Sequence, residues 1–393
     1  MNILIMTRTL TSGGAEKTAA NLATILSKNN HQVYIAVFDM NNKTYDTIAN
    51  IIDLSLYLNE KKRNPVIWYL KGIHRIKKVK RDYNVDVTIS FLNEPDLINV
   101  LSPKGDVRVV SVRNYRSRLI KNKIQFIRDK YVFSKSDYIV SLSKGVKKDL
   151  IDYFGIIERK VFVIYNPCDV EGILRRAIES PNICFAEADP IIVTLGRLTE
   201  QKGQWHLIRA FSDVVKKIPN VKLLILGQGE LKGYLEELIE GYNLSSSVIL
   251  CGYLANPYSI LKRGRLFVFS SLFEGLGNVL LEAMACGLPI ISTDCPTGPR
   301  EILEPDMNMN EEIKTVRYCK YGVLTPVCDG KRYTCDDSLT YEEKQISNAI
   351  IEILLNNELL IEYGEKSKKR VEDFSNETIA FQWENILKSK IGI

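Results

Sequence analysis

Two carboxylates, Glu274 and Glu282, stand out in a stretch of mostly small or apolar residues, FSSLFEGLGNVLLEAMACGLPIISTD at 269–294. Glu274 falls in the glycine-containing segment 270–277, which is expected to be a loop. Glu282 falls in the apolar segment 278–286, which is expected to be a helix. A helix that is apolar on every face is normally buried, and a buried carboxylate is costly unless a polar partner reaches it. We therefore expect Glu282 to be buried beside a polar group.

The junction between this loop and helix could bind an anion. The first backbone N–H groups of a helix have no partner within the helix, and the helix dipole adds positive potential there. A phosphate or sugar-phosphate is therefore expected at the five residues Gly275, Leu276, Gly277, Asn278 and Val279. The two carboxylates would accept hydrogen bonds beside it. A tight structural loop with a core glutamate satisfied by backbone groups explains the same residues equally well.

Short apolar runs flank the segment that carries Glu274 and Glu282. Leu266–Phe269 and Ile290–Thr293 are expected to be strands on either side of the helix. Similar runs alternate with helical stretches along the whole chain, at 2–7, 32–38, 85–91, 107–112, 138–142, 161–165, 191–195, 222–226 and 248–251. This alternation predicts an α/β fold with two doubly wound, Rossmann-like parallel sheets.

A chain of 393 residues is long for one core, so two domains are expected. We place the N-terminal domain at 1–170 and the second at 171–375, with the linker within 169–190. Residues 376–393 are expected to form a helix that packs back on the N-terminal domain. Residues 306–337 are expected to be an irregular insert.

The composition, 45% hydrophobic and 25% charged, is typical of a soluble globular protein, and no apolar run is long enough to span a bilayer. The eight cysteines lack metal-type spacing, which favours a reduced, cytoplasmic chain.

The charge is unevenly distributed along the chain: residues 1–170 hold 28 Lys and Arg against 16 Asp and Glu, a net +12, whereas the remainder carries −6. The two halves are therefore expected to have different partners.

Two basic stretches, 65–81 and 113–135, carry most of this positive charge among aromatic and aliphatic residues. The first has the pattern of a basic amphipathic helix. Such stretches are commonly solvated helix faces, but they also suit an anionic membrane surface. Nucleic acid is the least favoured partner, because no nucleic-acid-binding module is visible.

A glycine pair, Gly13 and Gly14, follows the first expected strand and opens a helix. Such a turn allows the backbone to approach a ligand closely. The full glycine fingerprint of dinucleotide-binding folds is absent, so the pair is weak evidence for a dinucleotide.

The chain resembles the GT-B glycosyltransferases of family 4, a large retaining group. The resemblance covers nearly the whole chain and rests on four strings: ILIMTRTLTSGGAEK at 3–17, TLGRLTEQKG at 194–203, LLILGQGEL at 223–231 and FEGLGNVLLEAMACGLPII at 273–291. It implies two domains facing each other across a cleft.

The resemblance also implies residue roles. Arg197 and Lys202 match the positions that contact the donor phosphates, and a cationic pair suits a diphosphate leaving group. Glu274 matches the acceptor for sugar hydroxyls, and Glu282 matches the acceptor for the ribose. The remaining donor-binding positions are Gly13 and Gly14 from the first domain, Gly227 and Tyr253 near the nucleobase, and the backbone of 275–279.

The implied reaction moves a hexose or N-acetylhexosamine from a nucleotide-diphosphate sugar, by default linked to UDP, with retention at the anomeric carbon. The resemblance implies neither a metal nor a cofactor. One departure concerns the first domain, where many family members carry a histidine after the strand that matches 107–112. Arg113 and Asn114 stand there instead, and they are candidates for a sugar or acceptor subsite, although neither can act as a general base at neutral pH.

The basic N-terminal half leads us to expect a lipid-linked saccharide as acceptor, in bacterial surface polysaccharide or lipopolysaccharide synthesis, at the inner face of the cell membrane. Another GT-B enzyme, either a nucleotide-sugar-processing enzyme or a transferase with a soluble acceptor, remains the alternative. A degenerate transferase serving as a binding subunit would fit poorly with intact Arg197, Lys202, Glu274 and Glu282.

Overall fold

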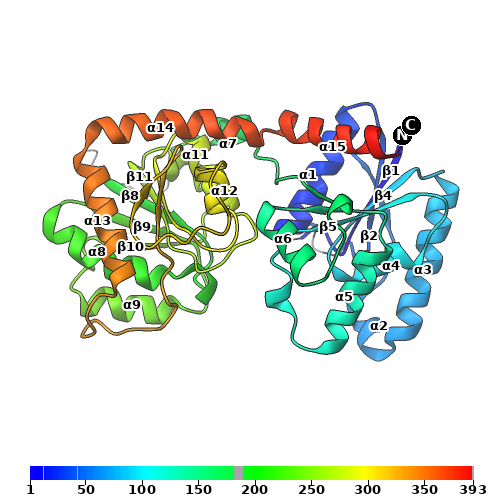
Figure 1. Cartoon of the computed structure of the whole chain (residues 1–393), viewed down its shortest axis with the longest axis horizontal. Helices are drawn as coiled ribbons and strands as arrows, with labels where there is room; N and C mark the ends of the chain where they lie inside the picture. The colour runs from blue at the N-terminus through cyan, green and yellow to red at the C-terminus, as the bar shows by residue number, and fades with distance from the viewer. Residues whose placement is uncertain (12, 42, 181–188, 392–393) are drawn as a thin grey trace. The chain divides into compact units, whose positions relative to one another are not determined.

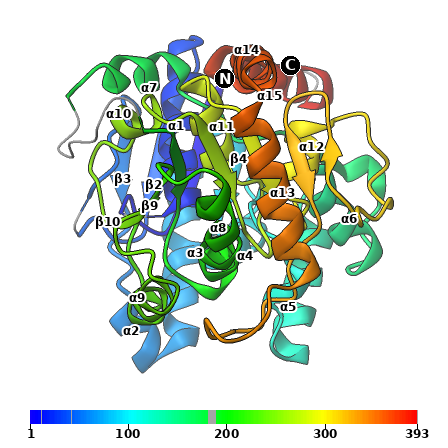
Figure 2. The same ribbon diagram turned by 90° about the vertical axis from the view of Figure 1, so that its left-hand side faces the viewer.

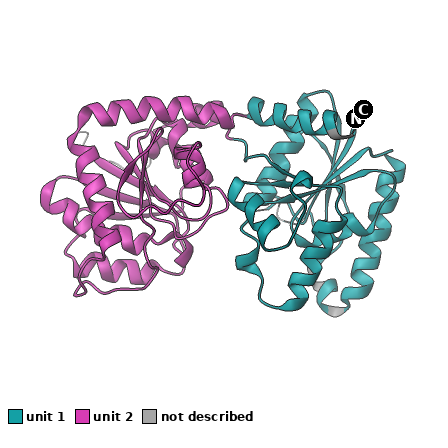
Figure 3. Ribbon diagram, viewed as in Figure 1, with its two compact units in different colours: residues 1–167, 376–393 teal, residues 168–375 magenta. Residues whose placement is uncertain are grey.

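The computed structural model of the chain describes residues 1–11, 13–41, 43–180 and 189–391. The chain forms two compact units, coloured separately in Figure 3, and Figure 1 labels their elements. Unit 1 comprises Met1–Pro167 with Asn376–Ile393, and unit 2 comprises Cys168–Ser375. The first unit thus ends at Pro167, where the sequence analysis expected residue 170.

Within the described residues, unit 1 contains a seven-stranded parallel sheet in the order β3-β2-β1-β4-β5-β6-β7. Its strands are β1 (Asn2–Thr7), β2 (Gln32–Val37), β3 (Asn50–Asp53), β4 (Val87–Phe91), β5 (Val107–Val112), β6 (Tyr138–Ser141) and β7 (Val161–Val163). Its α-helices are α1 (Gly14–Lys28), α2 (Leu58–Arg63), α3 (Pro65–Asp82), α4 (Asn93–Leu101), α5 (Lys123–Lys135), α6 (Lys144–Asp152) and α15 (Asn376–Ile391).

Helices cover both faces of this sheet. Ile3 and Ile5 of β1 pack with α1 and with Trp383 of α15 on one face. Leu4 and Met6 point to the other face, towards α3. α4 packs between α3 and α5. A strand with apolar side chains on both faces must be buried on both, which is why these strands appear in the sequence as continuous apolar runs.

Unit 2 has a second seven-stranded sheet among the described residues, in the order β10-β9-β8-β11-β12-β14-β13. Its strands are β8 (Ile191–Leu195), β9 (Lys222–Leu226), β10 (Val248–Gly252), β11 (Leu266–Phe269), β12 (Ile290–Thr293), β13 (Arg317–Tyr318) and β14 (Val323–Thr325). Its α-helices are α7 (Val170–Ala177), α8 (Gln204–Lys217), α9 (Lys232–Gly241), α10 (Tyr258–Leu261), α11 (Asn278–Ala285), α12 (Pro299–Leu303), α13 (Tyr341–Leu355) and α14 (Asn357–Val371). All neighbours pair in parallel except β13 and β14. In Figure 2, α13 runs beside α8, and both contribute to the core under the sheet.

The predicted fold class is confirmed, with three local corrections. The segment 306–337 is not wholly irregular, because it contains β13 and β14, which extend the sheet of unit 2. The region expected as a linker begins with α7, whose first turn is capped by the side chain of Asp169; its residues 181–188 lie outside the described residues. Residues 50–53, where no strand was expected, form the edge strand β3.

The predicted basic amphipathic helix is α3, but one of its cations is not on the surface. Lys80 is buried and lies 2.8 Å from Asp106, with Asn99 accepting a second hydrogen bond at 3.0 Å. Burial lowers the pKa of Lys80 to about 8, although Asp106 opposes the shift. Lys80 therefore anchors α3 to α4 and to the segment between α4 and β5, and it does not contribute to an exposed basic face. None of the helices in the described part of the chain is long and apolar enough to cross a membrane.

The C-terminal helix α15 belongs to unit 1 because its apolar side chains fill the core over α1. Replacing Trp383, which is 1% exposed, with alanine should lower the free energy of unfolding of unit 1 by about 3–5 kcal/mol, the usual cost of removing a buried aromatic side chain. Urea unfolding of unit 1 measures the change. Phe381 lies on the same helix but is 66% exposed, so Phe381→Ala should have little effect. Equal losses in both variants would show that α15 does not depend on this contact.

Candidate active site

The site in unit 2 lies at the carboxyl ends of β8 and β11, which are neighbours in the sheet. β8 leads into the loop that carries Arg197 and Lys202, and β11 leads into the loop that carries Glu274. Strand order changes direction between β8 and β11, because β9 and β10 lie on one side and β12 on the other. Ligands of open parallel sheets bind in the crevice at such a point.

Hydrogen bonds tie these two loops together. The backbone N–H of Leu272 donates to the carbonyl of Gln201 at 2.8 Å, and the Gln201 side chain donates to the carbonyl of Phe273 at 3.0 Å. The Ser270 hydroxyl donates to the carbonyl of Lys202 at 3.0 Å. The loops are thus held as one rigid surface.

On this surface Lys202 and Glu274 form an ion pair, with Nζ 2.5 Å from Oε1. Glu274 is 8% exposed, and the Lys202 ammonium also lies 5.0 Å from the centre of the Phe269 ring. The Glu274 backbone is fixed as well: its N–H donates to the carbonyl of Pro296 at 2.7 Å, and its carbonyl accepts from the N–H of Thr297 at 3.1 Å. The predicted sugar ligand and the predicted phosphate contact therefore lie within hydrogen-bonding distance of each other.

Arg197 supplies a second positive charge at the same edge of the sheet. Its side chain is exposed, and among the described residues its guanidinium has no hydrogen-bond or ion-pair partner. Its backbone is held by Gln204, whose side chain donates to the Arg197 carbonyl at 2.9 Å. A fixed backbone with an unengaged guanidinium suits recognition of an anion.

Buried polar atoms without partners in the described structure also gather here. They are the Thr199 hydroxyl, the Gln204 carbonyl oxygen and the Ser271 hydroxyl. Buried polar groups nearly always have partners, so orphaned ones point to a ligand or ordered water at the same edge. The sequence analysis missed these residues, although Thr199 lies inside the string that contains Arg197 and Lys202.

Two glycines allow the close backbone approaches that shape the site. Gly227 has φ +140°, and a Cβ there would overlap the carbonyl of Gly196, just before Arg197. Gly298 has φ +108°, and a Cβ there would overlap the carbonyl of Leu276. Both conformations are unfavourable for residues with a side chain. Gly227 was predicted as a donor-binding position; in the structure it supports the Arg197 loop.

Helix α11 begins at Asn278 after Gly277, which adopts a left-handed conformation with φ +86°. Its Asn278, Val279 and Glu282 are only partly buried, while Leu280 and Leu281 face the core. The expectation of a buried Glu282 is therefore wrong. The short helix packs against α7, α10 and α14, yet one side of its first turns stays partly exposed.

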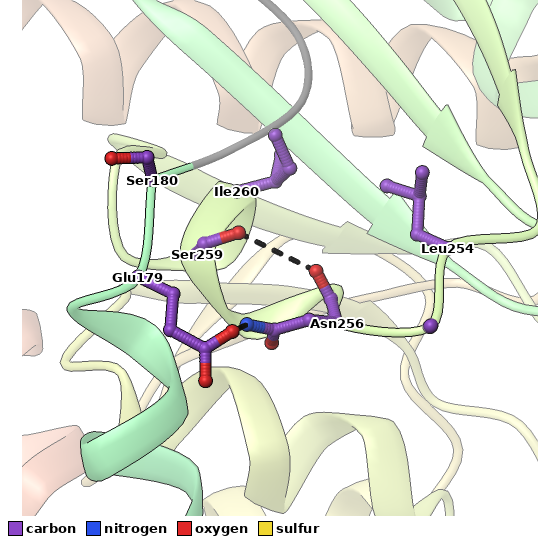
Figure 4. A pocket seen from close by; sticks show the side chains of 7 residues that line it. Glu179, Ser180, Leu254, Asn256, Ser259 and Ile260 are labelled. Atoms are coloured by element: carbon purple, nitrogen blue, oxygen red, sulfur yellow. Dashed lines mark hydrogen bonds between the residues drawn. The ribbon is translucent and has the colours of Figure 1, made fainter.

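The remaining predicted donor-binding positions lie outside the two loops that carry Lys202 and Glu274. Tyr253 is exposed and follows Gly252, whose carbonyl accepts from the N–H of Gly227 at 2.8 Å. A small pocket of about 140 Å³ lies just beyond it, lined by Glu179, Ser180, Leu254, Ala255, Asn256, Ser259 and Ile260. Figure 4 shows the Asn256 amide pointing to Glu179, to which it donates at 2.7 Å. This pocket was not predicted.

Gly13, Gly14, Arg113 and Asn114 belong to unit 1. Gly13 precedes α1, and the Glu16 carboxylate occupies the position where a Gly13 side chain would project. Gly14 is exposed with open space beside it, so sterics do not require a glycine there. Arg113 and Asn114 follow β5 at the carboxyl edge of the sheet of unit 1.

Cys295 lies close to the ion pair, in surroundings that disfavour its thiolate. Burial raises the pKa of its thiol well above the ordinary value, and the nearby Glu274 charge raises it further. A thiol that stays protonated is unreactive.

The chain has two Rossmann-like units, and the second carries a cationic and carboxylate site at the carboxyl edge of its sheet. This architecture is that of the GT-B class of nucleotide-sugar enzymes. Sequence profiles agree: the one described as Glycosyltransferase Family 4 matches residues 12–171, and the one described as Glycosyl transferases group 1 matches residues 176–309. The chain belongs to this glycosyltransferase family.

Known proteins resemble the chain over most of its length. An uncharacterized glycosyltransferase of Methanocaldococcus jannaschii is 34% identical over 360 residues, which cover 86% of this chain and 88% of the relative. A Campylobacter jejuni protein is 33% identical over 308 residues, covering 76% of this chain and 82% of the relative; its name is N-acetylgalactosamine-N,N'-diacetylbacillosaminyl-diphospho-undecaprenol 4-alpha-N-acetylgalactosaminyltransferase. Among solved structures, Anabaena HepE in complex with UDP aligns with a TM-score of 0.75 at 17% identity, covering 99% of this chain and all of HepE. That likeness shows the fold.

The close approach of Gly298 to Leu276 gives a test of how the Glu274 loop is held. Gly298→Ala should displace the loop, because the new side chain would overlap backbone and adopt a φ that costs on the order of 1–3 kcal/mol. Hydrogen exchange of the peptide spanning 272–281 should accelerate. Gly233→Ala on α9 is the matched control, since open space surrounds Gly233 and alanine favours a helix. Unchanged exchange in Gly298→Ala would contradict this account.

Proposed function

We propose that the protein is a retaining glycosyltransferase whose donor, a nucleotide-diphosphate sugar, binds at the carboxyl edge of the unit 2 sheet. The observation that carries this proposal is the Lys202–Glu274 pair, held beside Arg197 on two hydrogen-bonded loops. The class of enzyme follows from family membership, and the pair is suited to a donor that presents phosphate and hydroxyl groups side by side.

Each group has a role in this proposal. Arg197 and Lys202 neutralise the diphosphate, on which negative charge grows as the glycosidic bond breaks. The N-terminus of α11 adds backbone donors. Glu274 accepts from sugar hydroxyls, and the partly exposed Glu282 accepts from the ribose.

The reaction proceeds on one face of the sugar. The bond from the anomeric carbon to the phosphate oxygen breaks, and the bond to the acceptor oxygen forms on the same side. The proton of the incoming hydroxyl passes to the departing phosphate. Configuration is therefore retained, and positive side chains rather than a bound metal stabilise the leaving group.

The donor is proposed to be a UDP-linked hexose or N-acetylhexosamine. The HepE structure is a complex with UDP, and N-acetylgalactosamine is the transferred group in the name of the Campylobacter relative. The same name contains a diphospho-undecaprenol saccharide, which supports a lipid-linked acceptor in surface polysaccharide or lipopolysaccharide synthesis.

Unit 1 has features that suit a membrane-bound acceptor. α3 exposes Val66, Ile67 and Leu70, and α5 exposes Ile124 and Ile127. α3 ends at the amino edge of the sheet, where Asn2 donates to the carbonyl of Tyr83, so its apolar first turns lie towards the carboxyl edge. Exposed aliphatic side chains with basic neighbours on a helix favour binding to an anionic bilayer surface. We propose that the protein attaches peripherally to the inner face of the cell membrane through these helices.

Glu274→Gln tests the catalytic assignment. The amide keeps the size of the side chain but cannot pair with Lys202 or accept at both oxygens, so transfer should fall by roughly 10²–10³-fold, as for other groups that act in the transition state. The rate of sugar release from a UDP-sugar is the measurement, with circular dichroism to confirm folding. Glu240→Gln, on the exposed side of α9, is the control and should retain full rate. Near-normal turnover in Glu274→Gln would refute the site.

Vesicle flotation tests the membrane proposal. Ile67 and Leu70 are 52% and 60% exposed, so replacing both with serine should leave the fold intact. Binding to vesicles that contain phosphatidylglycerol should drop at least tenfold, because burying each side chain in lipid stabilises by about 1.5–3 kcal/mol. The control replaces Leu355 and Ile361, which are 69% and 61% exposed on unit 2, with serine and should leave flotation unchanged. Equal, weak flotation of the unaltered protein with neutral and anionic vesicles would rule the proposal out.

A further inference from the structure

Thr297, in the segment between β12 and α12, binds the backbone of the Glu274 loop through two groups. Its N–H donates to the carbonyl of Glu274 at 3.1 Å. Its hydroxyl lies 2.8 Å from the carbonyl of Gly275 and 3.1 Å from that of Glu274, so its hydrogen is shared between the two. Thr297 is buried, with 4% of its surface exposed. Two consecutive carbonyls of the loop therefore face this one residue.

The next carbonyl of the loop faces the same segment. The Leu276 carbonyl lies so close to Gly298 that a Cβ on Gly298 would overlap it. In a trans peptide the C=O group and the following N–H group point in opposite directions. The N–H groups of Gly275, Leu276 and Gly277 are therefore turned away from this segment. None of the three has a hydrogen-bond partner among the described residues.

These three successive N–H groups form a nest, an arrangement whose aligned dipoles attract an anion. The nest directly follows Glu274, whose carboxylate pairs with Lys202 Nζ at 2.5 Å. Gly275 is only partly buried, so the nest begins at a peptide group that a ligand can reach. An anion there would meet backbone donors beside the cation and carboxylate pair.

A buried ion pair fixes the segment that carries Thr297. Arg300 Nε donates to Asp294 Oδ1 at 3.0 Å, and Arg300 Nη2 contacts the other oxygen of the same carboxylate. The two side chains are 9% and 8% exposed. Arg300 Nη1 also donates to the carbonyl of Asn308 at 2.7 Å. Asp294 precedes residues 295–299 and Arg300 follows them, so this bidentate pair joins the ends of the segment and restricts its movement.

From these contacts we infer that Thr297 is a positioning residue for the donor: its hydrogen bonds to two carbonyls orient the N–H groups of Gly275 and Leu276 towards the phosphoryl oxygens. The inference rests on the proposed function, in which the backbone of 275–279 binds the donor, and it names the residue that orients this backbone. Thr297 itself touches no substrate. Without its hydroxyl the peptide between Gly275 and Leu276 loses its anchor, and the nest loses a directed donor.

UDP binding, measured by isothermal titration calorimetry on the full chain, tests the inference. Thr297→Val keeps the shape of the side chain but removes the hydroxyl, so the dissociation constant of UDP should rise about tenfold, as when one hydrogen bond to a charged group is lost. Thr297→Ser keeps the hydroxyl and should restore the affinity. Ser212→Ala is the control, because it removes another buried hydroxyl of unit 2, one that donates to the carbonyl of Arg209 at 2.8 Å. It should leave UDP affinity unchanged.

The melting temperature separates positioning from simple support of the fold. If Thr297→Val lowers the melting temperature and leaves UDP affinity unchanged, the hydroxyl only stabilises the loop and the inference is overturned. An equal loss of affinity in Thr297→Val and Thr297→Ser would also overturn it, because the hydroxyl would then not be the group that matters.

Pyrophosphate, which presents phosphoryl oxygens without a nucleoside, distinguishes this inference from the proposed function. Binding requires no turnover, so unchanged affinity in Thr297→Val together with lost transfer in Glu274→Gln would overturn the inference alone. Weaker pyrophosphate binding by Thr297→Val, in a chain that does not bind UDP, would support the nest and remove UDP as the donor nucleotide. An unaltered chain that binds neither ligand would overturn both the donor site and the role of Thr297.

Discussion

Lys202 and Glu274 lie 72 residues apart in the chain, yet their side chains meet at 2.5 Å. Two mainly buried charges are tolerated only when each compensates the other and the backbone around them is fixed, because an unpaired buried charge costs several kcal/mol. Here the fixing comes from hydrogen bonds between the loops and from Pro296 and Thr297, which hold the backbone of Glu274. Arg197 lies on the first of these two loops, and the second leads into α11.

The two sheets place their candidate sites in the same way. In unit 1 the strand order changes direction between β1 and β4, and in unit 2 it does so between β8 and β11. Thr7 and Phe91 lie at the first of these points, and the loops that carry Lys202 and Glu274 leave the second. Helices cover both faces of each sheet, so a ligand can reach the strands at the carboxyl edge, where the connecting loops leave them. Among the buried polar atoms that have no partner in the described structure, those of Thr7, Thr199 and Ser271 lie at these two carboxyl edges.

Much of the fold could be predicted because the central strands are buried on both faces and therefore appear as apolar runs. Lys222–Leu226 and Leu266–Phe269 were predicted to the residue. β13 and β14 were missed because they are two and three residues long and depend on pairing with each other and with β12. Glu282 was expected to be buried because periodicity shows how apolar a helix is, but not how close it lies to the margin of a domain.

The candidate site was predicted in part. Family motifs indicated Arg197, Lys202 and Glu274, and the structure brings the last two into contact. The orphaned Thr199, Gln204 and Ser271 were not indicated, since an unmet hydrogen bond is a property of packing and has no sequence signature. The neutral surroundings of Arg113 were equally invisible, because Phe91 lies far along the chain from Ile164 and Asn166.

The central claim is that a nucleotide-diphosphate sugar binds on the joined loops of unit 2. Hydrogen–deuterium exchange with and without a saturating UDP-sugar tests it directly. Our account predicts protection of the peptides that span 194–204 and 270–282, since a ligand that binds only the folded site suppresses its opening. Protection that appears elsewhere in unit 2 while both of these peptides exchange unchanged would contradict it.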